Sequence, residues 1–301
     1  MISSLLAYDK PEWDIGYWWD INTEWKLDMN GEIPAELSFT ENDCRFAVSS
    51  IEQRMLTHGS QSVHDAYVIN SEGLLFGEGQ VHVSGGPFPV TLNVRVQDTT
   101  ITSQIVVSRE SLGLLSWQRS FTGVLESLQG GNWEEIGEIS LNFKFEWDAP
   151  FDPYRFPFEI GDSWNEVTDV FWFGEYSIAV DIFSAVQEDS GFFDEMDQLN
   201  YSIDVSNVED VQGIPSVKIH IDYGSESFED IWFSPVVEWN IKNYSSGYTE
   251  DGLVYITDWD YLVTDFGQTP ATPEPTRTPQ PPTATPTSPP PTDPPPTVTG
   301  T

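Results

Sequence analysis

The chain has 301 residues, with 12 lysines and arginines against 49 aspartates and glutamates, so its formal charge at neutral pH is −37. A chain this acidic repels phosphate backbones and anionic lipid surfaces, which excludes nucleic acid as a partner and a polybasic mode of membrane binding. Hydrophobic residues make up 39% and aromatic residues 14% of the chain, enough to build a folded core. No run approaches the roughly 20 apolar residues of a membrane-spanning helix, so we expect no direct membrane insertion by this chain.

The first residues carry no basic segment, and their apolar run is too short for a signal peptide. We interpret residues 1–9 as the remnant of a trimmed leader, or as the start of a fragment. The chain holds one cysteine, Cys44, which rules out an intrachain disulfide and a multi-cysteine zinc site. We expect Cys44 to be a small buried apolar side chain.

Residues 10–150 are predicted to form a first β domain. From Ile139 to Trp147, apolar side chains alternate with polar ones, and Leu92, Val94 and Val96 show the same period of two. This alternation is typical of antiparallel strands with one apolar and one wet face. Turn pairs such as Asn30-Gly31 separate the strands.

Trp18 is the main candidate for ligand binding. In the first predicted strand, Trp13, Ile15, Tyr17, Trp19 and Ile21 fall on one face. Trp18 falls on the other face, between Asp14 and Asp20. An exposed indole beside carboxylates is suited to a sugar, because the ring packs against C–H groups while the acids accept hydroxyl hydrogens. The alternative is that Trp18 contacts another part of the chain.

Residues 151–267 are predicted to form a second, related β domain, with the boundary at residues 149–153. Several short patterns recur in the same order in both halves. Residues 13–16 match 158–161, residues 48–52 match 205–209, and three tryptophan pairs recur: Trp19/Trp164, Trp117/Trp239 and Trp147/Trp259. The sequence therefore indicates an all-β fold of two antiparallel sheet domains, each a curved sheet or a sandwich, with the paired tryptophans in the core.

The second half also resembles a known family. It opens on Pro157-Phe158-Glu159-Ile160-Gly161-Asp162-Ser163-Trp164, continues with Gly213-Ile214-Pro215-Ser216-Val217, and then carries Trp232-Phe233-Ser234-Pro235-Val236. These patterns resemble those of a β-rich domain of exported and lipid-anchored prokaryotic proteins of unknown function, over about 110 residues. The resemblance implies an envelope or extracellular location and a curved antiparallel sheet, and it supplies no catalytic residues.

An acidic cluster in the second half is the candidate metal site. Asp189, Asp194, Asp197 and Glu195 flank an expected turn at Gly191, and carboxylate oxygens are the ligands that Ca²⁺ prefers. A solvated acidic loop is the alternative, and no other cofactor is indicated. Glu195-Met196-Asp197 is similar to a glycosidase strand motif but lacks its third acid, so we assign no catalytic residue.

Residues 268–301 differ from the rest of the chain. They contain 13 of the 22 prolines and 11 threonines. Such a segment lacks the N–H donors and apolar side chains of a folded element, and predicts a disordered, extended stalk. Proline- and threonine-rich stalks are typical of proteins at the cell surface or outside the cell.

These patterns favour a non-enzymatic cell-surface or extracellular protein that binds a polysaccharide or another envelope component, or supports the envelope itself. Two alternatives remain open. A secreted polysaccharide hydrolase would need a cleft with two convergent carboxylates, one of raised pKa. A carrier of a lipid or another apolar ligand would need a sheet that encloses an apolar cavity of some 300 Å³ or more.

Overall fold

The computed structural model describes residues 7–58, 62–85, 88–182, 185–224, 227–246 and 254–269. By its internal contacts the chain divides into two units, Met1–Thr269 and Pro270–Thr301. All but the first two residues of the predicted stalk, and residues 1–6 of the predicted leader, lie outside the described residues.

The described residues form twelve β-strands and no helix. The strands are β1 (Tyr17–Met29), β2 (Ala35–Met55), β3 (Val63–Gly85), β4 (Phe88–Ser108), β5 (Leu114–Gln129), β6 (Asn132–Phe151), β7 (Ser163–Ile182), β8 (Ala185–Val211), β9 (Ile214–Gly224), β10 (Ser227–Ser234), β11 (Trp239–Ser246) and β12 (Val254–Gln268). The prediction of an all-β, antiparallel fold is confirmed. In the part of the chain that is described, no helix is long and apolar enough to cross a membrane.

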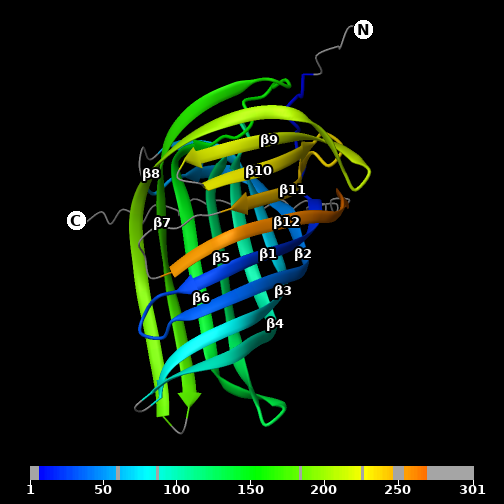
Figure 1. Ribbon diagram of the computed structural model, residues 1–301. Coiled ribbons are helices and arrows are strands. Elements are labelled where there is room, and N and C mark those ends of the chain that lie inside the picture. Colours follow the sequence, from blue (N-terminus) through cyan, green and yellow to red (C-terminus); the bar gives the residue numbers. More distant parts are fainter. Residues whose placement is uncertain are drawn as a thin grey trace, which may run out of the picture. The chain divides into compact units, whose positions relative to one another are not determined.

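The twelve strands make one closed barrel in which each strand pairs with the next in sequence. Antiparallel pairing of β12 with β1, from Tyr17 with Gln268 to Met29 with Val254, closes it. In Figure 1 the strands in front, β9–β12 and β1–β4, run across the long strands β5–β8 behind them. Among the described residues every strand therefore has a paired neighbour on both sides, although β11 and β12 pair at only three positions.

The two predicted domains, residues 10–150 and 151–267, do not form separate sheets. The expected boundary at residues 149–153 overlaps the end of β6, which runs to Phe151, and precedes β7, with six strands on either side of it. Each set alone would expose two edges and one apolar face. Joining the sets at the β6–β7 and β12–β1 seams pairs those edges and buries the faces together.

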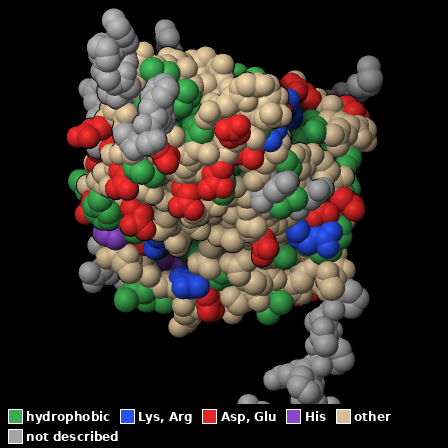
Figure 2. Space-filling model, turned by 90° about the horizontal axis from the view of Figure 1, so that it is seen from below, with side chains coloured by type: hydrophobic (Ala, Val, Ile, Leu, Met, Phe, Trp, Pro, Cys, Tyr) green, Lys and Arg blue, Asp and Glu red, His purple; other side chains and the backbone are tan. Residues whose placement is uncertain are grey.

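Alternation along the strands places the apolar side chains inside the barrel. In β1, Trp19, Ile21 and Trp25 are buried whereas Asn22 and Glu24 are exposed. The outer surface carries the charge, and Figure 2 shows acidic side chains spread over the face seen from below, with fewer basic ones. The predicted solvent face of the sheet is therefore the barrel exterior.

Aromatic side chains fill one end of the barrel. The segments before β1 and before β7 meet there, where the Tyr8 N–H donates to the Phe158 carbonyl at 2.9 Å. Trp13 and Phe158 are both fully buried, and the Trp13 indole donates to the Glu238 carbonyl at 3.0 Å. Tyr8, which falls within the predicted leader remnant, thus contacts the folded unit through this end of the barrel.

Candidate functional site

The barrel encloses a cavity of about 340 Å³. Inward side chains of strands on both halves of the sequence line it, and most of that lining is aromatic or aliphatic. Six of the chain's 12 tryptophans contribute, namely Trp19, Trp117, Trp147, Trp172, Trp239 and Trp259. This volume lies within the range of about 300–1,000 Å³ that is usual for small-molecule sites.

Most of the tryptophans predicted to form the core lie at the wall of the cavity. Of the three recurring pairs, five members line the cavity, and only Trp164 does not. Trp117 and Trp259 meet edge to face with ring centroids 4.9 Å apart, and Phe145 and Trp172 stack at 6.2 Å. These rings pack against the core on one side and border an empty space on the other.

A buried ion pair lies beside the aromatic wall. Glu41 of β2 and Arg119 of β5 have side chains only 0% and 2% exposed, and the Arg119 guanidinium pairs with the Glu41 carboxylate. The Trp25 indole donates to the other Glu41 oxygen at 2.6 Å, and the guanidinium lies 4.4 Å from the centre of the Trp259 ring. The sequence does carry a signal for this pair, because each charge occupies an inward position in an otherwise apolar alternation.

A second polar group faces the cavity from β9, β10 and β11. The Tyr223 hydroxyl donates to Glu229 at 2.9 Å, and the Asn243 amide donates to the other oxygen of the same carboxyl. Burial raises the pKa of Glu229, although both hydrogen bonds oppose this rise. Its carboxyl is therefore held in place by two neutral donors and no cation.

The cavity extends to the protein surface near the ends of β10 and β11. Ser227, Ser246 and Asp258 belong to its lining, and the Asp258 side chain is 42% exposed. Asp258 turns its carboxylate away to Lys26, at 2.6 Å. Among the described residues, the cavity thus reaches the surface at the end of the barrel opposite the one filled by Trp13 and Phe158.

The predicted sugar site lies on the barrel exterior, as expected, but its indole is covered. Trp18 is half-buried, and the Arg45 guanidinium lies 4.0 Å from the centre of its ring. Asp20 accepts two hydrogen bonds of 2.7 Å from Arg45, and the exposed Asp14 receives one of 3.4 Å from Gln268. Arg45 thus occupies the ring face on which a sugar would stack.

The candidate calcium ligands do not come together. Gly191 is not in a turn, because β8 runs without interruption from Ala185 to Val211. Asp189 is buried and accepts a hydrogen bond from the Ile33 N–H, whereas Asp194 is exposed. Five residues of extended strand span about 17 Å and place Asp189 and Asp194 on opposite faces. Among the described residues, no group of three His, Cys, Asp or Glu side chains is placed to hold a metal ion, so the structure does not bring Asp189, Asp194 and Asp197 together as ligands of one ion.

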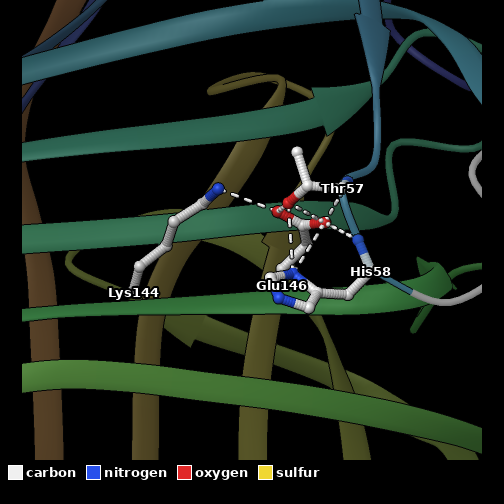
Figure 3. A network of polar contacts seen from close by, with 4 residues as sticks. All are labelled: Thr57, His58, Lys144 and Glu146. Carbon is white, nitrogen blue, oxygen red and sulfur yellow. Dashed lines mark hydrogen bonds and ion pairs between the residues drawn. The ribbon is translucent and has the colours of Figure 1, made fainter. Parts of the chain in front are cut away.

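Glu146 is a buried carboxylate that the sequence did not single out. Figure 3 shows it between Lys144 and the β2–β3 connection, where it accepts hydrogen bonds from Lys144 Nζ and the His58 N–H at 2.8 Å and from Thr57. Burial alone would raise its pKa, but these hydrogen bonds outweigh burial and lower the pKa. The His58 ring also stacks on Phe171 of β7 at 5.1 Å. This carboxylate therefore fastens the described part of the connection, Thr57 and His58, to the barrel exterior.

Among the described residues, the cavity is an enclosed apolar space of the size of a small-molecule site. The outer carboxylates predicted to act on ligands are either paired with the chain's own residues or spread along one strand. The resemblance of residues 157–236 to an exported domain stays a prediction. No family model, no curated protein and no solved structure matches this chain.

Proposed function

We propose that the barrel binds a small, largely apolar molecule in its interior. The observation that carries this proposal is the cavity of about 340 Å³ with its six tryptophans. This is the apolar-ligand alternative raised by the sequence. An extracellular or cell-surface setting for the carrier stays a prediction from the composition and the stalk.

Hydrophobic burial supports the proposal quantitatively. Removing about 300 Å² of apolar ligand surface from water contributes roughly 7 kcal/mol at about 25 cal/mol per Å². Part of this gain is lost because binding immobilises the ligand. Since 1 μM corresponds to about 8 kcal/mol and 1 mM to about 4 kcal/mol, we expect dissociation constants between about 10 μM and 1 mM for apolar molecules that fit.

The carboxylates that line the cavity support binding rather than hydrolysis. Both oxygens of Glu229 accept hydrogen bonds from neighbouring side chains, and Asp258 points to Lys26 outside the barrel. A glycosidase needs two carboxyl groups that converge on one bond. Neither carboxyl of this lining is placed to share a substrate atom with the other.

Titration with Nile red, a neutral dye whose emission rises in apolar surroundings, tests the proposal. Ile105 is a half-buried side chain of the cavity wall, so Ile105→Trp adds volume to the space that the dye would fill. Val124 lies on the exterior of β5, where it is 40% exposed, and Val124→Trp is the matched control. We expect saturable binding with about 1:1 stoichiometry, at least tenfold weaker in Ile105→Trp and unchanged in Val124→Trp.

Far-UV circular dichroism of each variant checks that the barrel is intact. Binding that is lost equally in both variants would place the dye on the exterior and contradict the proposal. Absence of saturable binding by the wild-type protein would contradict it directly.

A further inference from the structure

We infer that the molecule bound in the barrel carries a positively charged amine at one end of an apolar body, and that Glu229 binds the amine just inside the opening of the cavity. The inference rests on the proposed function and adds to it the chemical class of the ligand. The barrel would then take apolar amines in preference to alcohols of the same size, and would reject fatty acids and other anions.

The first observation is that Glu229 is a residue of the cavity wall that water can reach. It belongs to the lining and is half-buried rather than fully enclosed. Its strand, β10, is paired on both sides here, with Ser245 of β11 and Ile221 of β9, so the accessible surface belongs mainly to the side chain. That side chain points into the barrel, because its partners Tyr223 and Asn243 also line the cavity. A molecule in the cavity can therefore contact it.

The second observation is that the carboxyl group of Glu229 can accept further hydrogen bonds. One of its oxygens accepts from the Tyr223 hydroxyl at 2.9 Å, and the other accepts from the Asn243 amide. Each oxygen of a carboxylate can accept two hydrogen bonds, so each can take one more donor. Both donors are neutral, and burial raises the pKa of Glu229 in spite of them, because a negative charge is poorly solvated there. A ligand ammonium group would supply both a further donor and the opposite charge.

The third observation is the balance of charge around the cavity. Among the described residues of the lining, the charged side chains are Arg119, Glu229 and Asp258. Arg119 pairs with Glu41 inside the barrel, and Asp258 pairs with Lys26 outside it. A ligand cation at Glu229 thus meets a carboxyl group that has no cationic partner, whereas an anion would add a second uncompensated charge. Because buried unpaired charges are strongly disfavoured, this balance selects cations over anions.

The fourth observation is the depth at which Glu229 lies. Ser227 and Ser246 line the cavity where it reaches the surface, and Glu229 follows Ser227 by two residues on the same face of β10, about 7 Å further in. An ammonium group at this depth stays close to water, which limits the cost of dehydrating it. The remaining lining is mostly aromatic and aliphatic and can cover the apolar part of the ligand.

Three phenylalkyl compounds of nearly equal size separate charge from apolar burial: 4-phenylbutylamine, 4-phenylbutanol and 4-phenylbutyrate. Each is measured by displacement of Nile red at pH 8 and about 0.15 M salt, where long-range attraction between exposed charges is screened. The amine is protonated at this pH, because alkylammonium groups titrate at about 10. We expect the amine to bind about five- to tenfold more tightly than the alcohol, and the carboxylate at least tenfold more weakly than the alcohol. This ranking is measured on the wild-type protein and needs no variant.

Glu229→Gln assigns the preference to one residue, because it keeps the length of the side chain and removes its charge. We expect it to erase the preference for the amine over the alcohol. Two matched variants serve as controls, and both should keep the preference. Asp258→Asn removes the carboxylate at the opening of the cavity, and Glu138→Gln removes an exposed one from the barrel exterior.

Equal binding of amine and alcohol by the wild-type protein would overturn the inference, as would a Glu229→Gln variant that weakens all three compounds alike. Loss of the preference in Asp258→Asn or Glu138→Gln would show that charge outside the cavity attracts the amine, and would also overturn it. Tightest binding of 4-phenylbutyrate would overturn it in favour of a protonated Glu229 that donates to an anion. Nile red binding that none of the three displaces would overturn the ligand class while leaving the cavity as a binding site. Failure of Nile red itself to bind would contradict the proposed function instead.

Discussion

Glu41 and Arg119 form an ion pair in the barrel interior although their strands, β2 and β5, are separated by two others in the sheet. The two side chains meet across the inner face, and Trp25 donates a further hydrogen bond to Glu41. A buried pair of this kind gains Coulomb energy only at the expense of the hydration of both charges. The presence of the pair is therefore weak evidence that it stabilises the barrel.

Substitution of one partner or of both partners measures what the pair contributes to stability. We expect Arg119→Met to destabilise the protein by about 3–5 kcal/mol, because it leaves the Glu41 carboxylate buried without its cation. Glu41→Met together with Arg119→Met should recover most of that loss, since no charge is then left unpaired. Urea denaturation of Arg119→Met, Glu41→Met and the double variant gives the coupling energy between the two side chains. Additive losses would show that the two side chains stabilise the barrel independently.

Glu146 should make stability depend on pH in the acid range. Its pKa is lowered in the folded protein, so its contribution is fully present above the usual value of 4.5 and is lost as the pH falls through the folded pKa. We expect Glu146→Gln to cost about 1–2 kcal/mol at pH 7, because the amide accepts less strongly from Lys144 and the His58 N–H. The difference should shrink below pH 4.

Thermal unfolding of wild type and Glu146→Gln between pH 3 and pH 8 measures this effect. Glu138, which is exposed on the same strand, provides the control variant Glu138→Gln. A constant difference between wild type and Glu146→Gln at every pH would mean that the charge of Glu146 does not hold the β2–β3 connection.

Asp260 should make stability depend on pH in the opposite direction to Glu146. Burial, together with the charges of Glu24 and Asp258, raises its pKa to about 6, and Lys242 only partly compensates. The folded protein therefore holds a proton more tightly than the unfolded chain, and stability falls as the pH rises from about 4 through 6. After allowance for solvent screening, Asp260→Asn should stabilise the barrel by about 1 kcal/mol at pH 7.5 and leave it unchanged at pH 4.

Glu24→Gln is the companion variant, because Glu24 pairs with Asp260 across the β1–β12 seam. It should also stabilise the protein at pH 7.5, by a smaller amount. Destabilisation by Asp260→Asn at pH 7.5 would show that the carboxylate is favourably paired in solution.

The outer face of β1 allows a direct test of the sugar hypothesis. Trp18 lies against Gly267, where an added Cβ would be 3.0 Å from Trp18 Cζ2, and under Arg45. We expect Trp18→Ala to cost about 1–2 kcal/mol of stability through lost packing and lost cation–π contact. It should leave mobility in polysaccharide affinity gels unchanged. Retention that falls in Trp18→Ala and rises in Arg45→Ala, which uncovers the ring, would support a carbohydrate site.

Local structure was largely readable from the sequence. The alternation from Ile139 to Trp147 lies in an antiparallel strand, β6, and the expected boundary at residues 149–153 overlaps the end of that strand. Closure was not readable, because the pairing of Tyr17 with Gln268 joins residues at opposite ends of the folded unit and leaves no local pattern. A strand with one buried face has the same alternation in a sandwich and in a barrel.

The site was predicted only in part, for a related reason. The paired tryptophans were correctly placed inside, but a ring that borders a cavity and a ring in a filled core have the same sequence pattern. Arg119 between Trp117 and Phe121 did carry a signal, since a charge at an inward position needs a buried partner. Its partner Glu41 is far away in sequence and could be identified only from the fold.

Gly16 and Gly161, which the sequence paired as equivalent positions of a repeat, share an unusual conformation. Their φ angles are +94° and +96°, and each donates its N–H to a strand carbonyl, that of Val48 at 2.9 Å and that of Val205 at 2.8 Å. Val48 and Val205 were paired by the same repeat. That the halves arose by duplication stays a prediction, and this local agreement supports it.

Alanine at either glycine should therefore destabilise the protein, and the loss should be larger at Gly16 than at Gly161. Positive φ strains any residue with a Cβ, so Gly161→Ala, where the added Cβ meets no atom within 4 Å, should cost about 1–2 kcal/mol. Gly16→Ala adds a clash, because the Cβ would lie 2.7 Å from the Thr269 carbonyl oxygen at the end of β12. Thr269 also donates its N–H to the Gly16 carbonyl at 2.9 Å, so moving it weakens the seam that closes the barrel. We expect Gly16→Ala to be at least 1 kcal/mol worse than Gly161→Ala in urea denaturation. Equal losses of stability in the two variants would mean that Thr269 can move away from Gly16 without weakening the pairing of β1 with β12.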